Sequence, residues 1–313
     1  MKAAVINKFG PPEVFEIAEM PEPDITDDEL LIEVLAGSVN PIDCKQRKGN
    51  HKFIFGSRFP IILGYDVSGT VVRTGKKVKK FKIGEKVCGV LNNKYGGGLG
   101  QYAKSPEKCF SRLPENADVK RYAALPLAGL TVLQALRDKA KIREGHKILI
   151  IGAAGGVGNY AVQIANIFKA EVYAVSSARH ENFLGQLRPL HFIDYTKTDI
   201  TQVKERFDSI FDTAGTSFLV YRHLLRPGGI YVTTLPRPQI LVHKIMCMFT
   251  TGKKARTLLM RHDAADLEQL VTWVEEGKLS IYTDKEFSLK EISKAHVYSE
   301  EGHAEGKILI RYH

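Results

Sequence analysis

The stretch KILIIGAAGGVG, residues 147–158, decides the fold of this chain. Its apolar run KILII leads directly into the glycine-rich turn GAAGGVG. A helical pattern follows, with apolar positions at Val157, Ala161, Ile164, Ala165 and Phe168. Strand, glycine turn and helix in this order are typical of a βα unit that binds the pyrophosphate of a dinucleotide. The turn lets the backbone approach the phosphates, and the helix N-terminus faces their negative charge.

The residues after this unit repeat the alternation of strands and helices. Further strands are expected at Glu171–Ser176, His191–Tyr195, Ser209–Ala214 and Ile230–Leu235. A helix is expected at Ser217–Leu225, ended by Arg226-Pro227-Gly228-Gly229. Alternating strands and helices predict a parallel, doubly wound sheet of the α/β class.

The residues before this unit have a different texture. Short runs rich in Val, Ile and Leu are separated by Gly, Pro and Asn or Asp, which predicts a β-rich barrel or sandwich. These runs are Lys2–Ile6, Leu30–Leu35, Gly69–Val72 and Lys86–Leu91. Near the other end, Asp266–Glu276 predicts an amphipathic helix and Lys307–Ile310 a strand. Between them, Pro236–Arg261 is irregular and basic, which suits a lid, an interface segment or a plain surface helix and loop.

Composition excludes several classes of protein. The hydrophobic fraction of 44% and the charged fraction of 26% are those of a globular protein, and no apolar stretch is long enough to span a bilayer. Neither a signal peptide nor a Cys-x-x-Cys pair is visible, so a reduced, cytoplasmic setting is expected. The net charge is +10, with its densest run at Gly75–Lys82. This run is interpreted as a solvated hairpin turn rather than a nucleic-acid site, because aromatic residues are few around it.

The end of the second strand indicates which dinucleotide binds. An NAD site places a carboxylate there for the ribose hydroxyls, whereas this chain has Ser176, Ser177 and Arg179. An arginine offers a planar fork of donors to a 2′-phosphate, so NADPH is predicted over NADH. The alternative is that Arg179 is an ordinary exposed arginine. Tyr195 either flanks the same phosphate or packs as a plain tyrosine.

Several blocks along the chain carry a resemblance to a known family: Ser38–Asp43, Arg47–Gly49, Leu63–Gly69, Pro126–Thr131, the turn Gly152–Gly158, Gly302-His303 and Gly306-Lys307. Together they resemble the zinc-independent, quinone oxidoreductase-like branch of the medium-chain dehydrogenase/reductase superfamily, the zeta-crystallin relatives.

The resemblance implies a domain organisation and a cofactor site. It implies a GroES-like catalytic domain of residues 1–122 and 264–313, with a Rossmann NADPH-binding domain of residues 123–263 inserted between them. Taken together, the residue arguments above and the resemblance predict these cofactor residues: Thr131, Ala154, Gly155, Gly156, Val157, Gly158, Ser176, Ser177, Arg179, Tyr195, Gly215 and Lys307. Relatives often form homodimers through the cofactor domain, and the resemblance extends that option to this chain.

Departures from the zinc-dependent relatives predict that no metal is bound. Those relatives have a cysteine at the position of Asn40 and a histidine at the position of Tyr65. An amide and a phenol are poor zinc ligands beside thiolate and imidazole. The cysteine-rich lobe that holds structural zinc is missing too, since only Cys88 and Cys109 lie between Lys86 and Arg121.

Without a metal, a conjugated acceptor is an easier substrate than a simple alcohol. The predicted activity is therefore an NADPH-dependent reduction of a quinone or an α,β-unsaturated carbonyl. By resemblance, Asn40 and Tyr65 are candidate donors to the substrate oxygen, and Thr131 is a candidate contact of the nicotinamide. Asn40 as a loop cap and Tyr65 as a cleft-wall aromatic are the structural alternatives. The alternative functions are a low-turnover NADPH-binding interaction protein and a zinc-independent alcohol or acyl-thioester reductase.

Overall fold

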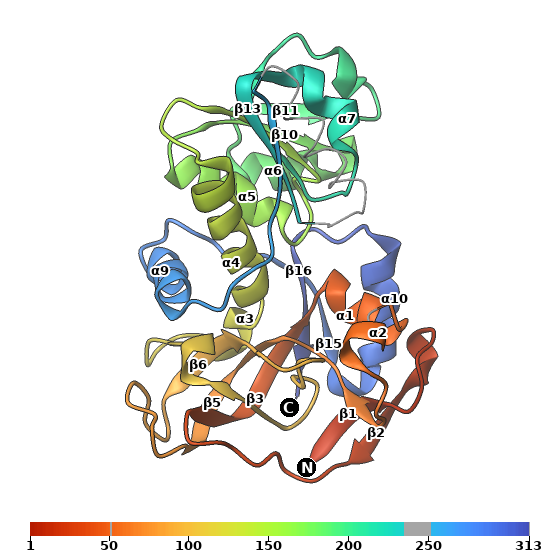
Figure 1. Cartoon of the computed structure of the whole chain (residues 1–313), viewed down its shortest axis with the longest axis vertical. Coiled ribbons are helices and arrows are strands. Elements are labelled where there is room, and N and C mark those ends of the chain that lie inside the picture. Colours follow the sequence, from red (N-terminus) through yellow and green to blue (C-terminus); the bar gives the residue numbers. More distant parts are fainter. Residues whose placement is uncertain (51, 235–251, 313) are drawn as a thin grey trace. The chain divides into compact units, whose positions relative to one another are not determined.

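The computed structural model describes residues 1–50, 52–234 and 252–312, and these form two compact units (Figure 1). The first unit contains Met1–Leu127, His262–Glu275 and Ile281–His313. The second contains Ala128–Arg261 and Glu276–Ser280. Most of the segment Pro236–Arg261, interpreted from the sequence as a lid, an interface segment or a plain surface helix and loop, lies outside the described residues.

The first unit is β-rich, and both early and late parts of the chain build it. A seven-stranded sheet has the order β15-β16-β3-β5-β6-β8, with β7 also paired to β3, and a three-stranded sheet has the order β2-β1-β4. The strands are β1 (Lys2–Ile6), β2 (Phe15–Glu19), β3 (Glu29–Val39), β4 (Ile61–Ile62), β5 (Asp66–Thr74), β6 (Lys86–Val90), β7 (Tyr102–Pro106), β8 (Phe110–Arg112), β15 (Thr283–Ser288) and β16 (Lys307–Arg311). The helices are α1 (Pro41–Arg47), α2 (Lys52–Phe55), α3 (Val119–Tyr122), α9 (Ala264–Glu275) and α10 (Ile292–Glu301).

Strand β3 is the centre of this unit because it pairs with both β5 and β16. Ser38 lies opposite Asp66 in one pairing and opposite Leu309 in the other. A buried cluster that includes Leu30, Ile32 and Val67 packs around it. The register of β3 therefore brings the starts of β5 and β16 to the same place.

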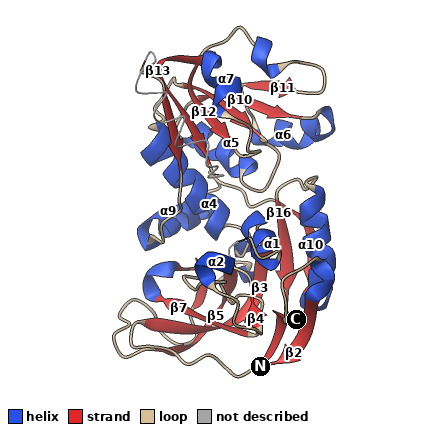
Figure 2. Cartoon of the chain, turned by 45° about the vertical axis from the view of Figure 1, so that its right-hand side comes forward, coloured by secondary structure: helices blue, strands red, loops and turns tan. Residues whose placement is uncertain are grey.

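The second unit is a parallel sheet of six strands in the order β11-β10-β9-β12-β13-β14 (Figure 2). The strands are β9 (Lys147–Ile151), β10 (Glu171–Ser176), β11 (His191–Asp194), β12 (Phe207–Asp212), β13 (Leu225–Thr233) and β14 (Lys254–Thr257). The helices are α5 (Gly158–Ile167), α6 (Glu181–Leu187), α7 (Phe218–Tyr221) and α4 (Pro126–Gln134), whose first residues belong to the first unit. In chain order the strands run 3-2-1-4-5-6, which is the doubly wound dinucleotide-binding topology. The predicted fold class is confirmed.

One expected helix is shorter than the sequence suggested. Instead of a single helix over Ser217–Leu225, α7 ends at Tyr221 and a 3-10 turn covers Arg222–Leu224. Residues 226–229 do not end a helix but lie within β13. The pairing of β13 with β12 shifts register there, so these residues are accommodated as an irregularity of the strand.

No helix in the described ranges is both long and apolar enough to cross a membrane.

Candidate functional site

The turn after β9 uses its glycines for two different purposes. A Cβ atom at Gly158 would lie 2.0 Å from the carbonyl oxygen of Gly152, so α5 packs directly against the strand end. A Cβ atom at Gly155 would meet only the same oxygen, at 3.6 Å. The protein therefore leaves space above Gly155. A tightly packed glycine at Gly158 and an open glycine at Gly155 fit a turn that must admit a pyrophosphate.

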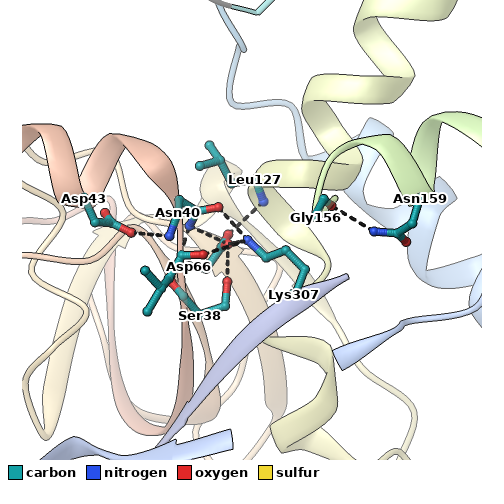
Figure 3. Close-up of polar contacts among 9 residues, drawn as sticks. Ser38, Asn40, Asp43, Asp66, Leu127, Gly156, Asn159 and Lys307 are labelled. Carbon is teal, nitrogen blue, oxygen red and sulfur yellow. Dashed lines mark hydrogen bonds and ion pairs between the residues drawn. The ribbon is translucent and has the colours of Figure 1, made fainter. Parts of the chain in front are cut away.

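Asn159 fixes the shape of this turn. Its buried side chain donates hydrogen bonds to the carbonyl oxygens of Gly155 and Gly156, at 3.0 and 3.1 Å (Figure 3). The sequence analysis did not single out Asn159. Its position directly after the last glycine, where the side chain reaches back over one helical turn, was the available signal.

The predicted phosphate-selecting residues gather at the ends of β10 and β11. Ser177 is buried, and its hydroxyl oxygen has no hydrogen-bond partner among the described residues, which marks a polar atom suited to a ligand. Arg179 is exposed, and its Nε donates to Nε2 of His180 at 2.9 Å. Tyr195 is also exposed, and its backbone N–H donates to the carbonyl oxygen of Ser176. This arrangement fits the adenosine end of a dinucleotide.

A carboxylate that was not predicted from the sequence, that of Asp194, also lies at the ends of β10 and β11. Asp194 pairs with Ser176 across β11 and β10, and its Oδ1 accepts hydrogen bonds from the N–H groups of Ala178 and Thr196. These bonds and one from the Thr196 hydroxyl, the largest contribution, lower the pKa of Asp194. Asp194 thus shapes the loop that carries Arg179. Asp194 was not predicted as part of this site because it belongs to the neighbouring strand and not to the residues that follow β10.

Gly215 and Thr131 occupy other parts of the second unit. Gly215 follows β12 with a φ of 77°, and its N–H donates to Oδ1 of Asp212 at 2.9 Å. Thr131 is half-buried on α4. Their predicted contacts with a cofactor stay predictions.

In the first unit, a buried polar cluster joins Ser38, Asn40, Asp66 and Lys307 (Figure 3). Oδ2 of Asp66 accepts hydrogen bonds from the Ser38 hydroxyl at 2.6 Å and from Nδ2 of Asn40 at 2.9 Å. Nζ of Lys307 lies 3.3 Å from the same oxygen and donates to Oδ1 of Asn40 at 2.5 Å. The backbone N–H of Leu127 donates to the other oxygen of Asp66 at 2.8 Å. Hydrogen bonds and one opposite charge thus compensate the buried carboxylate.

The cluster uses the hydrogen-bonding capacity of Asn40 internally. Its amide nitrogen donates to Asp66 and, at 3.4 Å, to the carbonyl oxygen of Ser38, while its amide oxygen accepts from Lys307. An amide has only two N–H donors. This geometry favours a positioning role for Asn40, and direct donation to a substrate stays a prediction. Lys307, predicted from the resemblance as a cofactor residue, lies in this cluster in the first unit.

The cluster does not fit a zinc ion. The described residues contain no group of three or more His, Cys, Asp and Glu side chains that could hold a metal. Around Asp66 the other groups are an amide, a hydroxyl and an ammonium, and the ammonium would repel a cation. Cys44, Cys88 and Cys109 are buried free thiols, and burial raises the pKa of Cys44 to about 12.

Asp43 is a second buried carboxyl beside this cluster. One of its oxygens accepts the N–H of Asn40 at 2.8 Å and caps α1, while the other oxygen has no hydrogen-bond partner in the part of the chain that the structure describes. Burial, with Asp66 adding repulsion and the Asn40 hydrogen bond and Lys307 opposing it, raises the pKa of Asp43 to about 7.

We expect Asp43 to make the protein less stable as the pH rises from about 4 to about 7. The folded chain keeps the proton of Asp43 up to about 7, whereas the unfolded chain loses it near 3.8, so the free energy of unfolding falls across this window. Asp43→Asn should flatten that fall in urea unfolding measured at several pH values. The exposed Asp24→Asn is the control. Equal pH dependence in all three proteins would show that folding does not raise the pKa of Asp43.

Tyr65 is the half-buried member of the predicted catalytic pair. Its hydroxyl donates to the carbonyl oxygen of Lys94 at 2.8 Å and accepts a hydrogen bond from Nε2 of Gln46 at 2.6 Å. Burial raises the pKa of Tyr65 to about 12, so the hydroxyl keeps its proton at neutral pH. The Tyr65 hydroxyl is therefore a neutral hydrogen-bond donor, and in this structure its acceptor is a backbone carbonyl oxygen.

Comparison with known proteins agrees with this fold. Residues 26–115 match the family described as an alcohol dehydrogenase GroES-like domain, and residues 190–310 match the one described as a zinc-binding dehydrogenase. The chain is 34% identical to the chloroplast envelope quinone oxidoreductase homolog of Arabidopsis thaliana, over 99% of this chain and 98% of that one. It is 29% identical to the chloroplastic NADPH-dependent alkenal/one oxidoreductase of Arabidopsis thaliana, over 99% of this chain and 79% of that one.

A solved structure extends the comparison to three dimensions. The quinone oxidoreductase from Coxiella burnetii superposes with a TM-score of 0.93 at 31% identity, covering 100% of this chain and 99% of that one. The chain belongs to the medium-chain dehydrogenase/reductase superfamily. Within it, the chain falls in the quinone oxidoreductase-like branch. The relative named as an NADPH-dependent oxidoreductase supports a nicotinamide cofactor.

Proposed function

We propose that this protein transfers a hydride from NADPH to a quinone or an α,β-unsaturated carbonyl and does so without zinc. The observation that carries the proposal is the similarity, along the whole chain, to relatives named as quinone and alkenal/one oxidoreductases. The open turn at Gly155 supports the dinucleotide, and the exposed Arg179 supports the 2′-phosphate. The buried ammonium of Lys307 supports chemistry without a metal.

The residues of the first unit suit the charge that such a reduction creates. NADPH, when bound, supplies the hydride, and negative charge then develops on the carbonyl oxygen of the acceptor. The Tyr65 hydroxyl donates a hydrogen bond to that oxygen instead of to the carbonyl oxygen of Lys94, and the hydrogen bond that it accepts from Gln46 strengthens the donation. Asn40 and Lys307 hold the adjoining loop in shape, and Thr131 contacts the nicotinamide.

Tyr65→Phe should lower kcat by about 10²-fold, since it removes one donor from the developing charge. The measurement is steady-state turnover with a small quinone, with the dissociation constant of NADPH measured separately and expected to stay constant. Tyr298→Phe is the matched control, because the Tyr298 hydroxyl bonds to Asp284 in the same unit. Unchanged turnover in Tyr65→Phe would reduce Tyr65 to a packing residue.

Arg179→Ala should raise the KM for NADPH about tenfold or more and leave the use of NADH almost unchanged. The reason is that only NADPH carries the 2′-phosphate, and a charge-assisted hydrogen bond contributes about 1.5–3 kcal/mol. Arg206→Ala is the control, because the guanidinium of Arg206, in the second unit, donates to the backbone carbonyl oxygens of Val203, Lys204 and Glu205. Equal losses with both dinucleotides would refute the selectivity.

The whole proposal is tested by following NADPH oxidation against small quinones, enals and enones, with alcohol oxidation measured in parallel. We expect turnover with conjugated acceptors and none with simple alcohols, unaffected by chelators. Tight NADPH binding without turnover of any acceptor would favour a low-turnover binding protein. Relatives are named as chloroplastic, so a cytoplasmic location stays a prediction.

A further inference from the structure

Helix α2 presents two adjacent apolar side chains to solvent. Phe53 is 92% exposed and Ile54 is 74% exposed. Within the described part of the chain, no other neighbouring pair of large hydrophobic residues has both side chains this exposed. Isolated exposed hydrophobic residues are ordinary, but an adjacent pair on one short helix needs an explanation.

The helix is anchored so that these side chains point away from its support. The next residue, Phe55, turns inward and packs edge-on against the ring of Tyr95, with centroids 5.6 Å apart. The hydroxyl of Tyr95 donates to the carbonyl oxygen of Gly56, directly after the helix. One aromatic residue therefore fixes α2 to the unit, while the ring of Phe53 contacts the ammonium of Lys52 on the same helix, 5.1 Å from the ring centroid.

The surroundings of α2 are basic. Residues 44–65 contain no aspartate or glutamate. Lys52, Arg58 and Lys94 are exposed, and none makes an ion pair with a carboxylate in the described ranges. The nearby Lys48 is different, since it pairs with Glu300 at 3.1 Å. The charge beside the exposed apolar pair is thus uncompensated and positive.

The size and charge of this surface decide which partner it fits. A stable protein interface buries about 800 Å² on each partner. A large aromatic side chain contributes only about 150–250 Å², so Phe53 and Ile54 fall well short of that area. A small apolar surface such as Phe53 and Ile54, flanked by lysine and arginine, instead fits the boundary of a bilayer. There the apolar side chains enter the acyl region and the cations bind anionic headgroups.

We propose that α2, with Lys52, Arg58 and Lys94, docks on the surface of an anionic lipid bilayer. The docking itself does not depend on the enzymatic activity. A consequence that does rest on the proposed function is that lipid-soluble quinones reach the protein from the bilayer.

Sedimentation with lipid vesicles tests the docking in the full chain. We expect binding to vesicles of phosphatidylcholine mixed with phosphatidylglycerol, release of the protein at high salt, and little binding to phosphatidylcholine alone. The double substitution Phe53→Ser and Ile54→Ser should lower the partition coefficient about tenfold or more, and Lys52→Gln about fivefold. Leu259→Ser is the matched control, because Leu259 is 88% exposed in the second unit.

Three results would overturn the docking. The first is that the wild-type protein shows no preference for anionic vesicles. The second is that the double variant binds like the wild-type protein, and the third is that Leu259→Ser loses as much binding as the double variant. Thermal unfolding of the double variant should match that of the wild-type protein, since the replaced side chains make few contacts.

Activity measurements separate docking from a role of Phe53 in holding substrate. Docking predicts that the double variant reduces a water-soluble quinone in buffer at the wild-type rate and loses rate only on a quinone dissolved in anionic vesicles. A lower rate on the water-soluble quinone would instead assign Phe53 to the substrate site and overturn the delivery of quinone from the bilayer. If the protein reduced no quinone, enal or enone, the proposed function would fail, while vesicle binding would still decide the docking.

Discussion

Lys307→Met lowers the free energy of unfolding by about 3–5 kcal/mol, the usual cost of leaving one partner of a buried ion pair without its opposite charge. The side chain of Lys307 is 4% exposed and that of Asp66 is fully buried. Methionine keeps most of the volume of lysine but cannot compensate Asp66. Asn40 also loses the donor to its amide oxygen. Urea unfolding of the wild-type and variant proteins measures the effect.

A surface pair with the same separation provides the control. Lys77 and Asp27 are also 3.3 Å apart, but their side chains are 75% and 52% exposed. Lys77→Met should cost less than about 1 kcal/mol, because water screens exposed pairs. The double variant Lys307→Met with Asp66→Asn should recover part of the loss, since it leaves no buried charge. If Lys307→Met cost no more than Lys77→Met, the buried pair would not be a main support of this unit.

Gly155→Ala raises the dissociation constant of NADPH about 5- to 150-fold while leaving folding intact. The added methyl group meets only the carbonyl oxygen of Gly152, at 3.6 Å, so the protein has room for it. Under the proposed function that room belongs to the pyrophosphate. Inserting a methyl group into a filled contact costs about 1–3 kcal/mol. Isothermal titration measures binding, and thermal unfolding measures the fold.

Two other glycines make this result specific. Gly158→Ala should damage both folding and binding, since its Cβ would lie 2.0 Å from the oxygen of Gly152. Gly185→Ala on α6 meets nothing within 4 Å and should leave binding unchanged while stabilising the helix by about 0.5–1 kcal/mol. Unchanged NADPH binding in Gly155→Ala would place the dinucleotide elsewhere.

Local patterns predicted the parts of the fold that have a strong period or a distinctive turn. The parallel sheet was predictable because its central strands are continuous apolar runs and glycine marks the first turn. Strands β2 and β15 were not predicted. Their sequences FEIAE and TDKEFS carry several exposed polar residues and show no clear alternation.

The candidate site was predictable only where its residues are close in sequence. The glycine turn and the residues after β10 fall into this group. The contact between Asp66 and Lys307 joins residues 241 positions apart, and only the register of β3 with its two neighbours brings them together. Asp194 was missed for the same reason, because a neighbouring strand delivers it beside Ser176. Such pairings depend on tertiary structure, which no window of sequence contains.

The pairing of β16 with β3 determines the order in which the two units can fold during synthesis on the ribosome. The strand Lys307–Arg311 completes a sheet whose other members, apart from β15, were made before residue 113. During synthesis one edge of β3 stays unpaired, and the carboxylate of Asp66 stays without its opposite charge, until the strand Lys307–Arg311 has been translated. The second unit can close in the meantime from contiguous strands. We therefore expect nascent chains that stop short of residue 307 to hold a folded nucleotide-binding half and an open, aggregation-prone amino-terminal half.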